Sequence, residues 1–216
     1  MLSTPGPTTV PPAVDRHPVV LVHGIWKTHA AFRRMSRYLT ERGFAVHGID
    51  LTPNDGSVGI EELAAQVAAY IEATFPAGTP IDLIGFSMGG LVTRYYVQRL
   101  GGLARVRRFI TISAPHHGTQ WAYLRKLPGY VQMRPDSEFL NDLNGDLAML
   151  MGLDFTSIWT PLDLMIMPPV SSRLGLGEEV LVAAPLHALM LQDPRSFKAV
   201  AAALSAPLRF CGTGPP

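Results

Sequence analysis

Continuous apolar runs and helical stripes alternate along the chain. Val19-Val20-Leu21-Val22 is a run of four apolar residues that ends at His23-Gly24, a pattern typical of a short strand buried on both faces. Residues 30–42 carry apolar side chains at helical spacing, and Gly43 then supplies a stop signal. The first two elements are therefore predicted to be a strand and an amphipathic helix.

The alternation continues to the end of the chain and predicts an α/β fold. Further strands are expected at residues 44–49, 81–86, 155–159 and 180–183, and another begins at the basic residues 105–108 and has its core at residues 109–113. Further helices are expected at residues 60–75, 87–101 and 194–204. Strands and helices that alternate without hairpin signals favour right-handed crossovers. We therefore expect a mostly parallel sheet of about six strands, with helices on both faces and ligands at the carboxyl ends of the strands.

Two stretches interrupt this alternation. Residues 1–18 contain five prolines and are expected to form an extended or disordered lead, which a single domain at residues 19–216 then follows. Residues 120–153 are the one long irregular excursion, with two short helices expected around residues 137–150. Neither stretch shows the composition shift of a linker between two domains.

Composition narrows the classes of function. Hydrophobic residues make up 47% of the chain and charged residues only 16%, against about 25% charged in an average soluble protein. Part of the surface is therefore expected to be apolar. The formal net charge is +1, and the longest basic cluster is Arg105-Val106-Arg107-Arg108, so nucleic-acid binding has no electrostatic support. The single Cys211 excludes an internal disulfide.

The chain lacks the sequence signals of membrane insertion and export. No apolar run approaches the roughly 18 residues that a membrane span requires. The first residues have no basic segment followed by an apolar one, as a secretory signal would. A cytoplasmic location is expected for the sequence as written, with secretion as the alternative if an export signal has been removed.

The strongest chemical signal is Gly85-Phe86-Ser87-Met88-Gly89. An apolar run enters this motif and a helical pattern leaves it, so Ser87 is expected at a sharp strand-to-helix turn with its hydroxyl exposed above the sheet. The two flanking glycines permit the turn, and the start of the helix favours negative charge on a substrate oxygen. The alternative interpretation makes Ser87 an ordinary helix N-cap.

Three motifs occur together in a specific order: Val22-His23-Gly24, residues 85–90, and Ser113-Ala114-Pro115-His116-His117-Gly118-Thr119. In this arrangement the chain resembles the α/β-hydrolase fold, and most closely the small bacterial triacylglycerol lipases and esterases. The resemblance covers roughly residues 19–204. It implies that the backbone N–H groups of Ile25 and Met88 form an oxyanion hole. His23 is expected to brace the loop and not to transfer protons.

The resemblance also implies a catalytic triad in the chain order Ser, Asp, His, which begins with Ser87. Asp163, in Asp163-Leu164-Met165-Ile166-Met167-Pro168, fits the family's pattern for the acid. Three other aspartates are weaker candidates. Asp154 precedes a predicted strand, while Asp142 and Asp146 lie in the presumed excursion helices, where a solvated face is the simpler role.

Seven histidines compete for the role of general base. His187 alone lies beyond Asp163, between the last predicted strand and the terminal helix, where the family places its base. His116 and His117 are the rivals. They precede the acid and match a family segment that does not supply the base, so they are expected to be structural or pocket residues.

These roles predict a serine carboxylic-ester hydrolase, a lipase or esterase that cleaves acyl esters through an acyl-enzyme on Ser87. One alternative is an acyl-thioesterase or acyltransferase with the same triad. A second alternative, from another class, is a catalytically silent binding protein with a hydrolase fold. The triad mechanism requires no metal or organic cofactor, so none is expected. A structural Ca²⁺ is not expected either, because no acidic spacing resembles a calcium loop.

Relatives with extended lids carry a longer insertion than residues 120–153, so little or no lid and a compact acyl pocket are expected. Substrate contacts are expected from Trp26, His117, Trp121, Leu164 and Ile166. The Met-rich runs at residues 149–151 and 165–167 fit either an acyl pocket or an ordinary core. The expected partner is a small-molecule or lipid ester, with transient contact at a lipid interface as a compatible feature. Acyl length and oligomeric state stay open.

Overall fold

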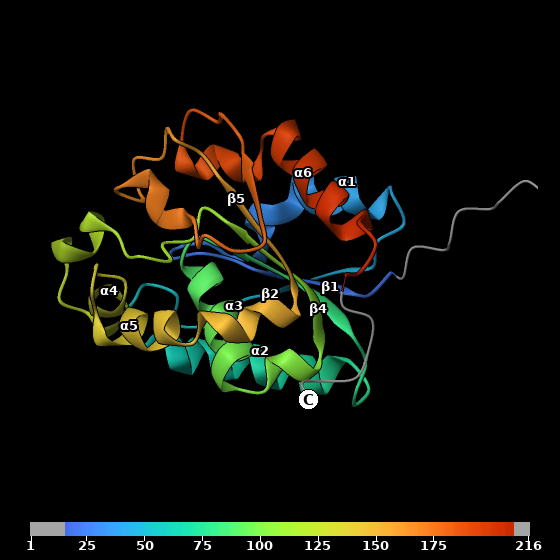
Figure 1. Ribbon diagram of the computed structural model, residues 1–216, viewed down its shortest axis with the longest axis horizontal. Coiled ribbons are helices and arrows are strands. Elements are labelled where there is room, and N and C mark those ends of the chain that lie inside the picture. The colour runs from blue at the N-terminus through green and yellow to red at the C-terminus, as the bar shows by residue number, and fades with distance from the viewer. Residues whose placement is uncertain (1–15, 210–216) are drawn as a thin grey trace, which may run out of the picture.

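The computed structural model describes residues 16–209 (Figure 1). Within that range the chain forms a six-stranded sheet in which all strand pairs are parallel. In spatial order the strands are β2 (Val46–Ile49), β1 (Val19–Val22), β3 (Ile81–Phe86), β4 (Val106–Ile112), β5 (Asp154–Trp159) and β6 (Glu178–Leu181). The predicted parallel α/β sheet is confirmed. Residues 1–15 of the expected Pro-rich lead lie outside the described residues.

Helices cover both faces of this sheet (Figure 1). On one face lie α2 (Ile60–Thr74) and α3 (Met88–Arg99), and on the other α1 (Arg33–Thr40) and α6 (Pro194–Ser205). Two short helices, α4 (Pro128–Gln132) and α5 (Glu138–Gly145), contact α2 and α3 respectively. None of the helices in residues 16–209 has the length and apolar character needed to cross a membrane.

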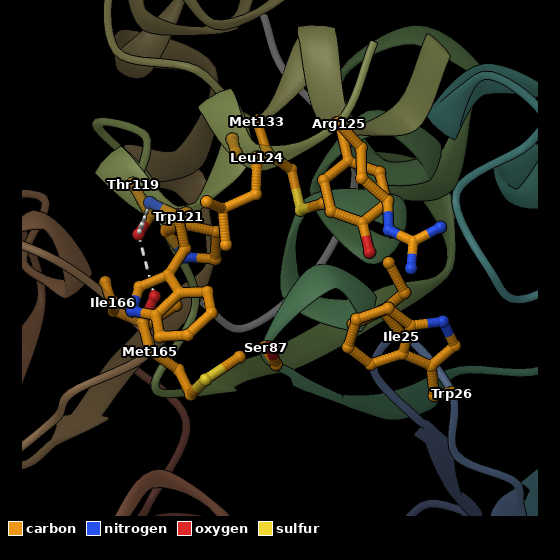
Figure 2. A pocket seen from close by; sticks show the side chains of 13 residues that line it. Ile25, Trp26, Ser87, Thr119, Trp121, Leu124, Arg125, Met133, Met165 and Ile166 are labelled. Carbon is orange, nitrogen blue, oxygen red and sulfur yellow. Dashed lines mark hydrogen bonds between the residues drawn. The ribbon is translucent and has the colours of Figure 1, made fainter. Parts of the chain in front are cut away.

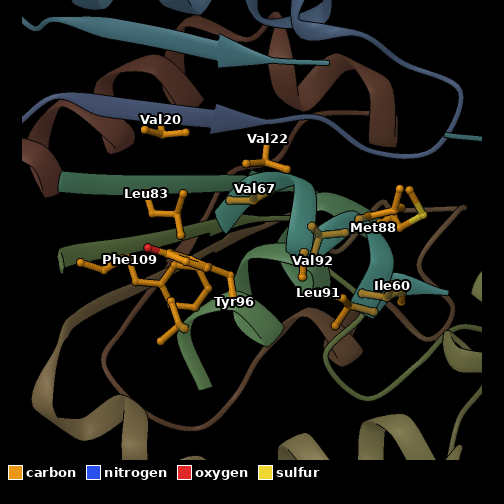
Figure 3. Packing of buried hydrophobic residues seen from close by; sticks show 14 of the residues in the cluster. Val20, Val22, Ile60, Val67, Leu83, Met88, Leu91, Val92, Tyr96 and Phe109 are labelled. Carbon is orange, nitrogen blue, oxygen red and sulfur yellow. The ribbon is translucent and has the colours of Figure 1, made fainter. Parts of the chain in front are cut away.

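The hydrophobic core is split between the two faces of the sheet. Successive side chains of a strand point to opposite faces. Val20 and Val22 of β1 therefore pack with Leu91 on the α2 and α3 side (Figure 3), while Val19 and Leu21 pack on the α1 and α6 side. All four β1 side chains are buried, as expected for a strand covered on both faces. A sheet enclosed in this way holds its strand ends in fixed positions.

The carboxyl ends of four neighbouring strands lie at one edge of the sheet. Val22 at the end of β1 pairs with Gly85, one residue before the end of β3. Phe86 at the end of β3 pairs with Ile112 of β4, which pairs with Ile158 near the end of β5. The segments that leave these strands therefore begin side by side, and they carry the motifs that the sequence analysis singled out.

The excursion at residues 120–153 contains more helix than the sequence predicts. The two helices expected around residues 137–150 correspond to α5 and a 3-10 helix at Leu147–Gly152. A further 3-10 helix at Gln120–Leu124 and α4 were not expected. Five-residue helices are too short to show an apolar period, although Pro128 at the start of α4 is a favourable first-turn residue.

Strand β4 begins at Val106, within the basic group expected at its start and three residues before its expected core. Two arginines in this part of the strand hide its apolar character. Arg108 is 1% exposed and its Nη1 lies 3.2 Å from Oδ2 of the equally buried Asp82 on β3. The pairing of opposite charges allows both side chains to lie inside the sheet region, which a single strand pattern does not reveal.

Candidate active site

Ser87 lies at the sharp turn between β3 and α3. Its backbone angles are φ 55° and ψ −127°, in a region that residues with side chains rarely adopt. Although Ser87 occupies the N-cap position of α3, its side chain makes no capping hydrogen bond. The alternative interpretation of Ser87 as an ordinary N-cap is therefore wrong. Backbone strain of this kind costs of order 1–3 kcal/mol and is concentrated at functional sites.

Glycines make this turn possible by allowing close backbone approach. A Cβ added to Gly85 would lie 2.5 Å from the carbonyl oxygen of Gly89. A Cβ added to Gly89 would collide with the backbone oxygens of Val22 and His23. The first turn of α3 is thereby held directly against the end of β1, which brings the segment after His23 next to Ser87.

His187 and Asp163 form a close pair at the same edge of the sheet. His187 Nδ1 lies 2.7 Å from Asp163 Oδ2, and the two side chains are 11% and 1% exposed. The other carboxylate oxygen, Oδ1, accepts hydrogen bonds from the backbone N–H groups of Met165 and Ile166, each at 2.9 Å. These bonds fix the carboxylate. A proton on Nδ1 that is donated to Asp163 leaves Nε2 of His187 as the basic nitrogen.

The imidazole of His187 lies beside the end of β3, which Ser87 follows. Its ring centroid is 4.8 Å from that of Phe86, the residue directly before Ser87. His187 begins the 3-10 helix at His187–Leu191, after β6, while Asp163 follows β5. The structure thus brings to one edge of the sheet three residues that are separated by up to a hundred positions in the chain.

The rival histidines lie elsewhere. His116 is fully buried, its Nε2 is 3.0 Å from Thr111 Oγ1, and burial lowers its pKa well below the usual value. His117 is exposed at the surface, with Nδ1 3.5 Å from Nδ2 of Asn144. Its pKa is lowered, first by partial burial and then by the charge of Arg94. Neither ring contacts a carboxylate in the described part of the chain.

The weaker acid candidates form ion pairs with arginines. Asp142 and Asp146 both pair with Arg99, at 2.9 and 2.7 Å from its Nη2. Asp154 lies 3.5 Å from Arg209 Nε. The side chains of Asp142 and Asp146 are 55% and 53% exposed, as expected for a solvated face. Asp154 is only 13% exposed and begins β5, whereas Ser87 follows the end of the parallel strand β3.

The two backbone groups expected to form the oxyanion hole flank the nucleophile turn. Met88 is the first residue of α3, and the first N–H groups of a helix have no acceptor within it. Ile25 lies in the loop after β1 and lines the same cavity as Ser87. Met88 lies at the positive end of the α3 dipole, which favours an oxygen that gains negative charge.

His23 braces the loop that carries Ile25. Its Nδ1 lies 2.9 Å from the carbonyl oxygen of Gly24, and its Nε2 accepts a hydrogen bond of 2.9 Å from the backbone N–H of Leu51. An accepting Nε2 requires the neutral ring with its proton on Nδ1. Burial is the main cause that lowers the pKa of His23, against a smaller opposing effect of the Gly24 bond.

The buried neutral histidines predict a loss of stability in mild acid. The pKa of His23 and that of His116 are lowered from 6.5 in the folded state, so the unfolded chain binds protons first as the pH falls below that value. The free energy of unfolding should therefore be highest above pH 6.5. It should decrease as the pH falls below 6.5, by up to about 1.4 kcal/mol per pH unit for each histidine. Urea unfolding at pH 7.5, 6.5 and 5.5 measures this slope. A free energy that is constant or rises toward pH 5.5 would contradict it.

An apolar cavity of about 360 Å³ opens beside Ser87 (Figure 2). Its lining residues are Ile25, Trp26, Ser87, Pro115, Thr119, Trp121, Ala122, Leu124, Arg125, Tyr130, Met133, Met165 and Ile166. Three residues expected to contact substrate, Trp26, Trp121 and Ile166, are among them. His117 and Leu164 are not. His117 is exposed at the surface, whereas its neighbour His116 is buried, and Leu164 is 60% exposed.

Several lining residues were missed from the sequence. Thr119 ties the two walls of the cavity together, since its Oγ1 donates to the carbonyl of Met165 at 2.7 Å and accepts from the N–H of Met167 at 3.0 Å. Arg125 and Tyr130 come from the excursion, whose path the sequence pattern does not predict. Of the Met-rich runs, residues 149–151 do not line the cavity. Among residues 16–209, no group of three or more His, Cys, Asp or Glu side chains is placed to hold a metal ion.

Comparison with known proteins gives relatives among lipases and thioesterases. The chain is 32% identical to a triacylglycerol lipase of Pseudarthrobacter phenanthrenivorans over 119 residues, which are 51% of this chain and 36% of that protein. It is 34% identical to the lysosomal thioesterase PPT2 of Homo sapiens over 107 residues, 47% of this chain and 34% of that protein. The matched part thus spans about a third of the length of these relatives.

Solved structures share the fold at low sequence identity. Aspergillus fumigatus lipase B matches with a TM-score of 0.73 at 19% identity, over 89% of this chain and 53% of that one. The mature form of Bacillus licheniformis lipase BlEst2 matches with a TM-score of 0.69 at 16% identity, over 93% and 96% of the two chains. The predicted α/β-hydrolase fold and the resemblance to bacterial triacylglycerol lipases are confirmed.

A family model described as palmitoyl protein thioesterase matches residues 18–128, just over half of the chain. The match runs from the start of β1 through the turn at Ser87 to the start of α4. The chain, an α/β-hydrolase in its fold, belongs to the palmitoyl protein thioesterase family.

Proposed function

We propose that this chain is a serine carboxylic-ester hydrolase in which Ser87, His187 and Asp163 form the catalytic triad. The observation that carries the proposal is the 2.7 Å pair of His187 and Asp163 beside the strained turn at Ser87, next to an apolar cavity. Nucleophile, base and orienting acid occur in the chain order of α/β-hydrolases. The cavity supplies a place for an acyl chain.

In the first half of the reaction, the oxygen of Ser87 attacks the ester carbonyl while Nε2 of His187 takes its proton. The carbonyl oxygen gains negative charge and faces the N–H groups of Ile25 and Met88, each of which typically contributes about 10²- to 10³-fold in rate. Asp163 holds the imidazolium in place. The bond to the alcohol then breaks, and His187 returns the proton to that leaving group.

In the second half, water replaces the alcohol. His187 takes a proton from the water, whose oxygen attacks the acyl-enzyme carbonyl, and the same two N–H groups receive the charge again. The carboxylic acid leaves as the proton returns to Ser87. The apolar wall of the cavity limits the access of other water molecules to the reacting atoms.

A thioester substrate is the second candidate, favoured by the family model and by the relatives named lysosomal thioesterase PPT2. Both reactions pass through the same acyl-enzyme and differ in the leaving atom. Lipid substrates of either kind are supported by the exposed side chains of Trp26 and Trp121, 54% and 44% exposed, at the cavity mouth. These two rings also support transient contact with a lipid interface.

An oxygen ester and a thioester of the same acyl chain separate the two candidates. We expect p-nitrophenyl esters, in a series from acetyl to palmitoyl, to be hydrolysed in a reaction that depends on Ser87. The matched acyl-CoA series, followed by release of the free thiol, gives kcat/KM for the sulfur leaving group. A higher kcat/KM for acyl-CoA at every chain length would assign the chain to thioester hydrolysis instead.

A further inference from the structure

The cavity beside Ser87 has two chemically different sides (Figure 2). Trp121, Met165 and Ile166 lie on one side of Ser87, together with Thr119. The hydroxyl of Thr119 is already bonded to the Met165 carbonyl, so this side offers a ligand mostly apolar contacts. On the other side lie Ile25 and Arg125, whose guanidinium is directed toward the loop after β1. An ester bound at Ser87 would therefore extend one arm over an apolar wall and the other toward a positive charge.

The guanidinium of Arg125 has no ion-pair partner among residues 16–209. No carboxylate oxygen of the described residues lies within 4.0 Å of it, the longest distance of an ion pair. Arg125 has a small electrostatic effect on Asp55, whose pKa is lowered mainly by hydrogen bonds with Ser57 and only slightly by Arg125. Arg125 instead lies 6.0 Å from the ring of Trp26, a loose cation–π distance.

Tyr130 brings a second polar group to the same cavity. This residue is only 6% exposed, and its hydroxyl is buried with no hydrogen-bond partner among residues 16–209. Its ring lies 6.2 Å from that of Trp26. Burial raises the pKa of Tyr130, and the charge of Arg125 opposes that rise. A buried donor without a partner costs free energy, which an acceptor on a ligand would recover.

We infer that the cavity selects substrates that carry an anionic group, such as a carboxylate, on the arm that extends toward Arg125 and Tyr130. Arg125 attracts the anion and the hydroxyl of Tyr130 donates a hydrogen bond to it. This inference rests on the proposed function, because it concerns esters that react at Ser87. The protein's net charge of +1 creates no general field for anions, so the selectivity has to come from these local groups.

Matched esters with and without the charge test this inference. On the acyl arm, p-nitrophenyl hydrogen adipate is compared with p-nitrophenyl methyl adipate, and on the alcohol arm, 3-carboxy-4-nitrophenyl butanoate with its methyl ester. For each pair the ratio of kcat/KM, anionic over neutral, is measured after subtraction of the rate with Ser87→Ala. Comparing the ratio between variants cancels the difference in intrinsic reactivity of the esters. The pair of esters whose ratio changes in Arg125→Met identifies the arm that extends toward Arg125.

We expect Arg125→Met to lower the ratio for one of the two pairs by about 10-fold, the effect of losing one hydrogen bond to a charged group. Tyr130→Phe removes only the hydroxyl and should lower the same ratio roughly 3-fold. Lys126→Met is the matched control, since it removes one positive charge from the next residue, which does not line the cavity. It should leave both the ratio and the basal rate unchanged.

Three results would overturn the inference. If the ratio of Arg125→Met equals that of the wild type for both pairs, Arg125 is excluded as the selecting group. An equal fall in Lys126→Met shows a general charge effect. A wild type that hydrolyses the neutral esters well but discriminates against both anionic esters excludes anion selection. A failure of the proposed function is distinct from all of these, because then neither ester is hydrolysed above the Ser87→Ala background.

Discussion

Replacing Ser87 with alanine is expected to lower kcat/KM for p-nitrophenyl esters by about 10³-fold or more, because the groups of a triad act as a unit. Without the hydroxyl, no acyl-enzyme forms, and His187 and Asp163 have no proton to move. The residual rate should come only from binding and from the N–H groups of Ile25 and Met88. Initial rates over the acyl series from acetyl to palmitoyl measure the effect.

The fold has to be shown intact before such a loss is assigned to chemistry. The side chain of Ser87 makes no capping hydrogen bond, so the substitution Ser87→Ala removes no interaction that begins α3. Circular dichroism and the midpoint of urea unfolding should therefore match the wild type closely. An undiminished rate in Ser87→Ala would exclude Ser87 as the nucleophile. A wild type without measurable ester or thioester hydrolysis would instead favour the silent binding protein.

The second large effect is expected at His187. Replacement by alanine should abolish covalent labelling by a fluorophosphonate probe, because Ser87 then loses the base that makes its oxygen nucleophilic. His117→Ala is the matched control, one imidazole removed at a position that is exposed at the surface and does not line the cavity. The His117→Ala variant should be labelled by the probe at the wild-type rate. Gel fluorescence after a timed incubation gives the labelling rate of each variant.

This pair of variants also decides between the two interpretations of the histidines. Labelling that survives in His187→Ala but disappears in His117→Ala would reassign the base to His117. Loss in both variants would point to a general disturbance, which the urea midpoint detects. The 2.7 Å contact of His187 with Asp163 leads us to expect neither result.

The sheet and the turn at Ser87 could be predicted because each depends on local sequence. A strand buried on both faces has to be apolar throughout, as residues 19–22 are, and a turn with φ of 55° at Ser87 needs small neighbours such as Gly85 and Gly89. The order of the motifs then placed Asp163 and His187 in the loops after β5 and β6. These predictions depend on strand ends, whose positions the sheet fixes.

The wall of the cavity could not be predicted, because long-range contacts place it. The N–H of Gly129 bonds the carbonyl of Gly56 at 3.0 Å, and this contact brings α4 and Tyr130 over the loop after β2. No periodicity signals a contact of that kind. The two adjacent histidines after β4 are a second case in which sequence was not enough. His116 is buried and His117 is exposed, a difference that depends on tertiary packing and that the sequence pattern does not reveal.

The separate origins of the cavity wall and the reacting groups have a practical consequence. Most of the residues that shape the cavity belong to one stretch between β4 and β5. The proposed reacting groups instead lie in the segments that follow β3, β5 and β6. Grafting that stretch from another member of the fold should retune substrate preference and leave the hydrolytic machinery in place. Substrate range and turnover could therefore evolve independently in a molecule built this way.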